Sequence, residues 1–152
     1  MKKMLVLLVL LLGLQQEASA QEPAGASAYL EGVFDLREDR TTILHIVNPT
    51  RADLRLFVAF FDDSERPLRC FPGELSANDL MEINVREVGV DAPLGVVKVI
   101  TFARNEDRPQ IGVVGNQRLS LGRQPTIETG LHPIQSQFLE SELPVIRQLC
   151  RF

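Results

Sequence analysis

The run from Leu54 to Asp62 constrains the fold more than any other part of this chain. It reads LRLFVAFFD, and aliphatic and aromatic residues occupy both the even-numbered and the odd-numbered positions. Alternate side chains of a β-strand point to opposite faces of a sheet, so a strand that is apolar on both faces needs cover on both sides. We therefore interpret residues 54–62 as a central strand of a β-sandwich.

Further strand candidates surround this run, and turn residues separate them. The candidates recur at roughly 8- to 12-residue intervals, which is typical of an all-β sandwich or barrel. Between them no run of about ten residues or more has the apolar period of a helix, so a parallel sheet with crossover helices is disfavoured. We predict an antiparallel β-sandwich of about seven strands over residues 28–119. The other six candidates are residues 28–36, 41–47, 68–71, 80–85, 94–102 and 110–119.

The last part of the chain, residues 120–152, has a different pattern. Residues 120–133 are rich in glycine and proline and are expected to be mostly irregular. Beyond them, a short helix would have Ser141 as its N-cap and Pro144 in its first turn. Such a helix is too short to stand alone, so we expect it to dock on the sandwich. Its apolar stripe would comprise Phe138, Leu139, Leu143, Ile146 and Leu149.

Residues 1–20 have the three parts of a secretory signal peptide. Two lysines precede the apolar run Met4–Leu12, and Ala18–Ala20 matches the small-residue cleavage pattern. The run is shorter than the roughly 20 residues that a membrane-spanning helix needs. We predict cleavage before Gln21, with an uncleaved anchor as the alternative. Residues 21–27 then form a flexible leader to the domain.

Both cysteines, Cys70 and Cys150, lie in the part that would be exported. In an oxidising compartment two cysteines commonly pair, so we predict an intramolecular disulfide. Such a bridge would contribute about 4.5 kcal/mol by the chain-entropy estimate. Two free thiols or an intermolecular bridge are the alternatives. Neither His45 nor His132 stands at metal-ligand spacing from a cysteine.

Charge and hydropathy restrict the partners. The chain carries 16 basic and 20 acidic residues, and the basic residues are scattered. This distribution is not a nucleic-acid footprint. No second apolar run approaches the length that spans a bilayer. We therefore expect a chain without membrane insertion after signal cleavage, located in the periplasm or outside the cell.

One segment carries a resemblance to known domains. The residues Ile46–Thr50, IVNPT, end one strand, and a second strand follows that leads to Phe60–Asp63, FFDD. This pattern resembles immunoglobulin-like β-sandwich modules of bacterial exported proteins. The chain departs from antibody-type domains because it has no tryptophan and because its cysteines are not in the inter-sheet arrangement of such domains. The resemblance implies an architecture and no specific function.

Acidic and histidine side chains are the candidates for a metal site or a catalytic site. Asp62, Asp63 and Glu65 cluster in one loop and are weak candidates for a calcium site, but the spacing of a calcium-binding loop is absent. A solvated hairpin turn explains them better, so no metal is predicted. His45 lies within a strand candidate without a local nucleophile or carboxylate, which favours a structural role. 

The sequence contains no recognisable catalytic or cofactor motif. No Gly-x-Ser-x-Gly elbow occurs, and the segment Gly112–Gly115 has neither the lysine nor the following helix of a phosphate-binding loop. We therefore predict no cofactor and no enzymatic activity. Five phenylalanines could line a ligand cavity, although core filling is the simpler interpretation. They are Phe57, Phe60, Phe61, Phe71 and Phe102.

Together these features favour an exported, non-enzymatic protein-binding module with a structural, adhesion or assembly role in the cell envelope. Its partner would be another envelope protein, and its edge strands would be the contact surface. Residues 21–28 could themselves donate a strand. The alternative is a soluble periplasmic carrier that holds a small apolar ligand between a sheet and the C-terminal segment. A hydrolase would require a pocket that joins His45 to a carboxylate.

Overall fold

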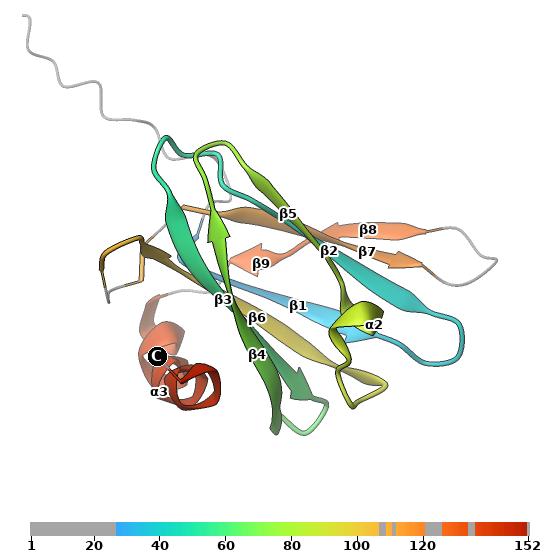
Figure 1. Cartoon of the computed structure of the whole chain (residues 1–152). Helices are drawn as coiled ribbons and strands as arrows, with labels where there is room; N and C mark the ends of the chain where they lie inside the picture. The colour runs from blue at the N-terminus through green and yellow to red at the C-terminus, as the bar shows by residue number, and fades with distance from the viewer. Residues whose placement is uncertain (1–26, 107–108, 111, 121–125, 134–135, 152) are drawn as a thin grey trace, which may run out of the picture.

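Two antiparallel sheets face each other, and a C-terminal helix lies against the outer side of one of them (Figure 1). The computed structural model describes residues 27–106, 109–110, 112–120, 126–133 and 136–151. The five-stranded sheet has the order β4 (Pro67–Leu75), β3 (Leu54–Asp62), β6 (Leu94–Ala103), β1 (Tyr29–Asp35) and β9 (His132–Pro133). The four-stranded sheet has the order β5 (Leu80–Asn84), β2 (Thr41–Val47), β7 (Val114–Ser120) and β8 (Ile127–Gly130). The helices are α2 (Val85–Val88) and α3 (Ser136–Cys150).

This architecture confirms the predicted all-β antiparallel sandwich and its C-terminal helix. β3 lies inside its sheet, between β4 and β6, and eight of its nine residues are buried. Leu56, Val58 and Phe60 face the other sheet, whereas Phe57 and Phe61 face the helix side. Both faces of β3 are apolar because one face packs against the other sheet and the other packs against α3.

The first core fills the space between the sheets. β2 alternates strictly between buried and half-buried residues, as a strand with one inward face should. Leu44 and Ile46 of β2 are fully buried and belong to the same cluster as Leu56 and Phe60 of β3. The rings of Phe34 and Phe60 meet edge to face at 5.7 Å within this core.

The second core lies between the five-stranded sheet and α3. Ile146 of α3 has no exposed surface and packs among sheet residues that include Phe57, Ala59 and Phe102. α3 begins at Ser136, so the predicted start at Ser141 was wrong, and Pro144 lies within the helix. Packing on the sheet and the bridge at Cys150 hold this proline in a position that helix propensity alone disfavours.

The structure differs from the sequence prediction in several short elements. β8 and β9 lie within residues 120–133, which were expected to be mostly irregular. α2 was not predicted; Asn84 caps its start by accepting a hydrogen bond from the Arg86 N–H at 3.2 Å, and Gly89 ends it in the left-handed region. β4 is longer than expected and β7 begins later. Nine strands are present in the described residues, against about seven predicted.

Of the predicted signal peptide and leader, residues 1–27, the structure describes only the last residue. The predicted signal peptide, residues 1–20, and leader residues 21–26 lie outside the described residues. Ser27, the last residue of the expected leader, is buried and its N–H donates to the Val113 carbonyl at 2.9 Å. The chain is therefore joined to the sandwich from Ser27 onward.

Candidate interaction surface

The helix α3 covers the part of the outer face of the five-stranded sheet that β3 and β4 form, and a disulfide holds it there at its C-terminal end. Cys70 of β4 and Cys150 of α3 are bonded, with Cα atoms 5.1 Å apart and a sequence separation of 80 residues. The predicted pairing of the two cysteines is thus what the geometry shows. Leu143, Ile146 and Leu149 of α3 pack on this face, where a carrier would have held its ligand.

An ion pair between a buried lysine and a partly exposed glutamate joins the helix to the sheet. Lys98 of β6 is only 5% exposed, and its Nζ lies 2.5 Å from Oε2 of Glu142 on α3. The same ammonium group lies 4.8 Å from the centroid of the Phe61 ring. Tyr29 is buried beside them, and no hydrogen-bond partner for its hydroxyl occurs in the described part of the chain. Burial, with a contribution from Glu142, raises the pKa of Tyr29 well above its usual range.

No described segment covers the outer face of the opposite sheet, and His45 lies on the inner strand β2 of that face. Nδ1 of His45 lies 2.8 Å from Oδ1 of Asn116, and Nε2 lies 3.0 Å from Oε2 of Glu82. The sequence did not predict a carboxylate here, because Glu82 comes from β5 and Asn116 from β7 and only the strand registers bring them together. The row of polar side chains crosses three strands. It ties the sheet together on its solvent side.

The acidic cluster of the β3–β4 hairpin serves the turn itself. The Asp62 carboxylate is 6% exposed and accepts hydrogen bonds from the N–H groups of Ser64 and Arg66, both at 2.9 Å, and from Arg66 Nε at 2.7 Å. These donors lower the pKa of Asp62. Asp63 and Glu65 are exposed. No group of three or more metal-ligating side chains was found in the described residues.

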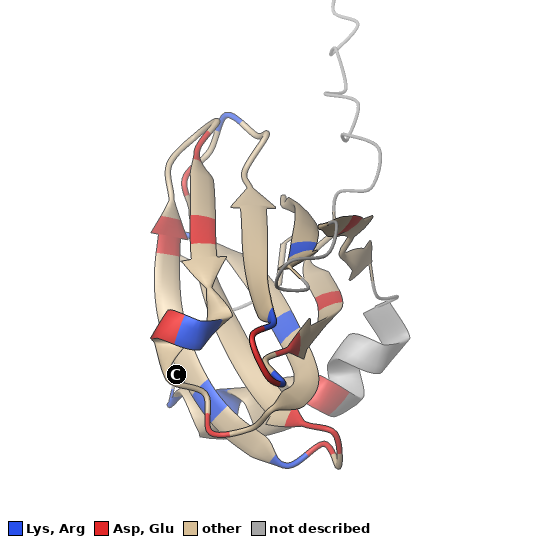
Figure 2. Ribbon diagram, turned by 90° about the vertical axis from the view of Figure 1, so that its right-hand side faces the viewer, with Lys and Arg blue, Asp and Glu red and all other residues tan. Residues whose placement is uncertain are grey.

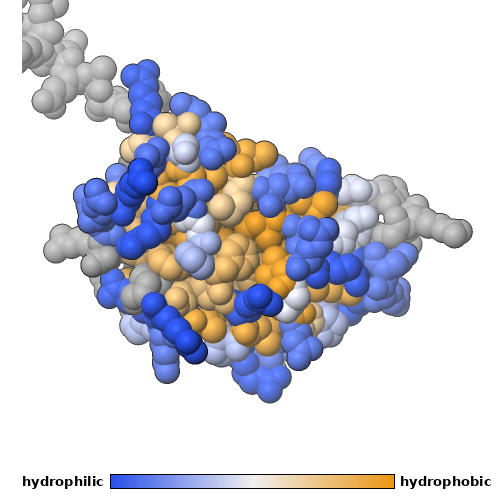
Figure 3. Space-filling view, in the orientation of Figure 1, coloured by the Kyte–Doolittle hydropathy of each residue, from blue (hydrophilic) through white to orange (hydrophobic). Residues whose placement is uncertain are grey.

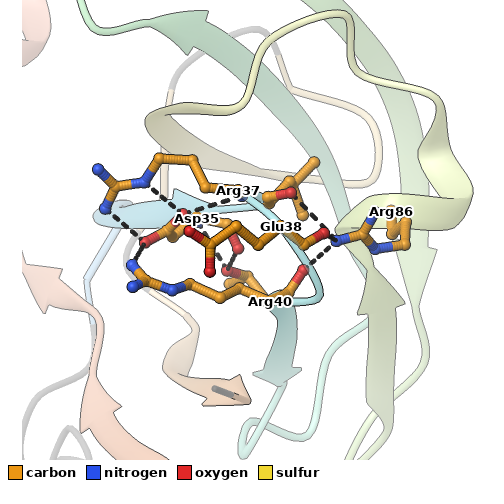
Figure 4. A network of polar contacts seen from close by, with 7 residues as sticks. Asp35, Arg37, Glu38, Arg40 and Arg86 are labelled. Carbon is orange, nitrogen blue, oxygen red and sulfur yellow. Dashed lines mark hydrogen bonds and ion pairs between the residues drawn. The ribbon is translucent and has the colours of Figure 1, made fainter. Parts of the chain in front are cut away.

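A second buried carboxylate organises the turn between β1 and β2 (Figure 4). Asp35 accepts hydrogen bonds from Arg37 Nη2 and Arg40 Nη1, each at 2.7 Å. The Arg37 guanidinium is the main cause that holds the pKa of Asp35 well below its usual range. From the other side Arg86 donates to backbone carbonyls of the turn, those of Leu36 and Arg40 among them. This network fixes the turn against α2.

The strand edges differ in how accessible they are to another strand. β4 contains Pro67 and Pro72, which lack the N–H that a paired strand needs. On the free edge of β1, the Val33 N–H donates to Oε1 of Gln117 at 3.0 Å, and the Asp35 N–H donates to Oγ1 of Thr42 at 2.9 Å. Side chains therefore accept hydrogen bonds from the two N–H groups of this edge that lie beyond the short pairing of β1 with β9. β5 and β8, the outer strands of the four-stranded sheet, contain no proline.

On one side of the sandwich the outer strands of the two sheets, β4 and β5, leave apolar side chains partly exposed. Figure 3 shows this side, with an apolar surface between the two strands and around α2. We call it the β4–β5 flank. Its members are half-buried and pack on the core between the sheets: Leu68, Phe71, Met81, Val88, Val90 and Ala92.

An open cavity of about 450 Å³ lies next to this flank, between the β3–β4 hairpin and the loop before β6. We call it the acidic pocket, because three aspartates and one arginine line it. Arg66 pairs with Asp62 at 2.6 Å, whereas Asp63 and Asp91 are exposed and have no ion pair in the described residues. The lining residues are Asp62, Asp63, Arg66, Pro67, Leu68, Asp91, Ala92, Pro93 and Leu94.

Charge elsewhere is mixed. In the view of Figure 2 the acidic and basic residues are distributed over loops, α2 and a few strand positions, and neither sign dominates a sheet face.

Comparisons with known proteins establish the fold and nothing further. No family model matches the chain, and no curated protein matches it. A solved structure, the crystal structure of Thermotoga maritima 1070, is similar with a TM-score of 0.56 and 11% sequence identity. The similarity covers 72% of this chain and 96% of that chain. At this identity the likeness concerns architecture alone.

Proposed function

We propose that this protein is an exported, non-enzymatic protein-binding module with a structural, adhesion or assembly role in the cell envelope. The observation that carries the proposal is the asymmetry of the two sheets. One sheet has α3 bonded over its outer face, whereas no described segment covers the outer face of the other. The four-stranded sheet and its edge strands are thus available to a partner.

The uncovered sheet has the mixed chemistry of a protein contact surface. Leu80 at the start of β5 is 55% exposed and lies on the same face of the sheet as the polar row of Glu82, His45 and Asn116. Apolar groups with fixed polar groups among them are typical of interfaces between proteins that also exist separately.

Export of the module is part of the proposal. It is supported by the signal-peptide pattern of residues 1–20 and by the Cys70–Cys150 bond, since disulfides persist in oxidising compartments. Within the described residues no helix has the length and apolar character needed to cross a bilayer. The immunoglobulin-like character of the sandwich likewise remains a proposal, supported by the strand–Asn-Pro-Thr–strand segment.

Site-specific photo-crosslinking in the host cell would test this function. A photoreactive residue at Leu80 or Glu82 samples the uncovered sheet, and one at Val145, which is 43% exposed on α3, is the matched control. We expect a defined protein adduct from the sheet positions and none from position 145. A strictly monomeric protein without adducts at either sheet position would contradict the proposal.

The carrier alternative gains no support from the described residues. Its expected site, between the five-stranded sheet and α3, is occupied by Ile146 with no exposed surface. Native mass spectrometry of the purified protein tests it directly, because a carrier would retain a small molecule.

A further inference from the structure

We propose that the β4–β5 flank is the peptide-binding groove of this module, and that its ligand is an extended partner segment with alternating apolar residues and a cationic residue at one end. The partner backbone would pair with β5, its apolar side chains would cover the flank, and its cation would enter the acidic pocket. This inference rests on the proposed protein-binding function and specifies the partner's chemistry.

The backbone of β5 can accept a strand. β5 pairs with β2 on one side, and no described strand pairs with its other side. Its sequence, LMEIN, retains every backbone N–H group. β4, the opposite wall of the flank, has lost two of these donors at Pro67 and Pro72. An added strand therefore has one suitable edge on this side of the sandwich, and that edge is β5.

The side chains of the flank require an apolar, alternating ligand. Phe71 from β4 and Met81 from β5 are only half-buried, although both pack on the core. A strand that pairs with β5 turns every second side chain towards them. Covering these groups removes apolar surface from water, which favours binding. The Phe71 ring already stacks on Phe60 at 6.0 Å, so the surface is pre-formed.

The surface of the flank is continuous between the two strands. Met81 of β5 packs directly on Gly73 of β4. Arg69 of β4 reaches the loop beyond α2, where its Nη1 donates to the carbonyl of Gly89 at 3.4 Å. Arg69 is exposed, so the contact can be exchanged for a contact with a ligand backbone.

The acidic pocket selects the end of the ligand. Asp62 pairs with Arg66, whereas Asp63 and Asp91 line the pocket without an ion pair in the described residues. A volume of about 450 Å³ accommodates a lysine or arginine side chain. Residues 21–26 of this chain do not fit, because QEPAGA has no alternating large apolar side chains and no lysine or arginine side chain. Charge complementarity therefore indicates a segment of another protein.

Binding of defined peptides tests the inference. The probes are a blocked, fluorescein-labelled octapeptide in which valine and threonine alternate before a terminal arginine, and its counterpart that ends in glutamate. Fluorescence anisotropy with the full mature chain should show the arginine peptide binding about tenfold more tightly than the glutamate peptide. The Asp63→Asn/Asp91→Asn double variant should bring the two affinities to within about threefold of each other. Both positions are exposed, so this variant should fold normally.

Hydrogen exchange locates the bound peptide. The arginine peptide should slow exchange of the amides of residues 80–84, with residues 127–130 of β8 as the control edge. Equal affinities for the two peptides, no binding at millimolar concentration, or protection of β8 in place of β5 would each overturn the inference. A self-associated protein whose dimer dissociates on Asp91→Asn would also overturn it, because the occupant would then be a second copy. If the peptides fail while Leu80 still yields a crosslinked partner, the flank is excluded and the proposed function stands.

Discussion

Lys98 and Glu142 meet 2.5 Å apart between the five-stranded sheet and α3, although 44 residues separate them in the chain. The lysine is almost completely buried, whereas the Glu142 side chain is 30% exposed. Burying an ammonium group costs free energy, and one carboxylate offsets that cost only in part. The pair therefore sets the position of α3 on the sheet more than it stabilises the fold.

Removing only the carboxylate should be harmful. Glu142→Gln leaves Lys98 buried without a counter-charge and should lower the free energy of unfolding by about 2 kcal/mol, less than for a fully buried pair because Glu142 is partly exposed. Lys98→Met together with Glu142→Gln should recover most of that loss. Urea unfolding of both single variants and the double variant measures the coupling between the two positions. Additive losses would show that the two side chains do not interact.

The apolar contact of α3 should contribute more than its ion pair. Ile146→Ala removes a fully buried side chain from the second core and should cost about 3 kcal/mol of unfolding free energy. Val145→Ala, on the exposed side of the same helix, is the matched control and should change stability by less than about 0.5 kcal/mol. Equal effects of the two substitutions would mean that α3 does not dock as described.

The disulfide should stabilise the whole sandwich and not the helix alone. Opening the bridge between Cys70 and Cys150 frees a loop of 80 residues in the unfolded chain and should lower the unfolding free energy by about 4.5 kcal/mol. The expected result is a lower urea midpoint in the presence of a dithiol reductant. A Cys70→Ser/Cys150→Ser variant should already have the low midpoint and should not respond to the reductant.

The sequence predicted those parts of the fold that a local pattern of apolar and β-branched residues identifies. β3 is recognisable because both alternations of Leu54–Asp62 are apolar, which only a strand covered on two sides explains. β2 is recognisable because the run Thr41–Val47 is rich in β-branched residues and ends at the turn residues Asn48 and Pro49. The pairing of Cys70 with Cys150 followed from their number and the expected compartment, and needed no structural information.

Other parts could not be predicted because they depend on contacts between distant segments. β9 has two residues and exists because Leu30 and Glu31 of β1 pair with it. The contact between His45 and Glu82 also could not be predicted, because only the register of β2 and β5 brings the two residues together. The β4–β5 flank is likewise a product of the fold, since its walls come from different sheets.

The stability of the β1–β2 turn should depend on pH through Asp35. Its pKa is lowered in the folded protein, mainly by the Arg37 guanidinium, whereas an unfolded aspartate titrates near its usual value of about 3.9. Below that value the unfolded chain binds a proton that the folded chain still excludes. The contribution of Asp35 is therefore complete above about pH 4 and is lost as the pH falls towards the folded pKa.

Asp35→Asn should accordingly lower the unfolding free energy at pH 7 by about 2 kcal/mol, because the arginines lose a buried charged acceptor. The same variant should lose less additional stability than the wild type between pH 5 and pH 2. Asp39→Asn, an exposed position in the same turn, should leave the pH profile unchanged. Asp62 also has a lowered pKa and remains in the Asp35 variant, so part of the acid sensitivity should persist. Parallel pH profiles for Asp35→Asn and the wild type would show that the carboxylate of Asp35 is not held by Arg37 and Arg40 in solution.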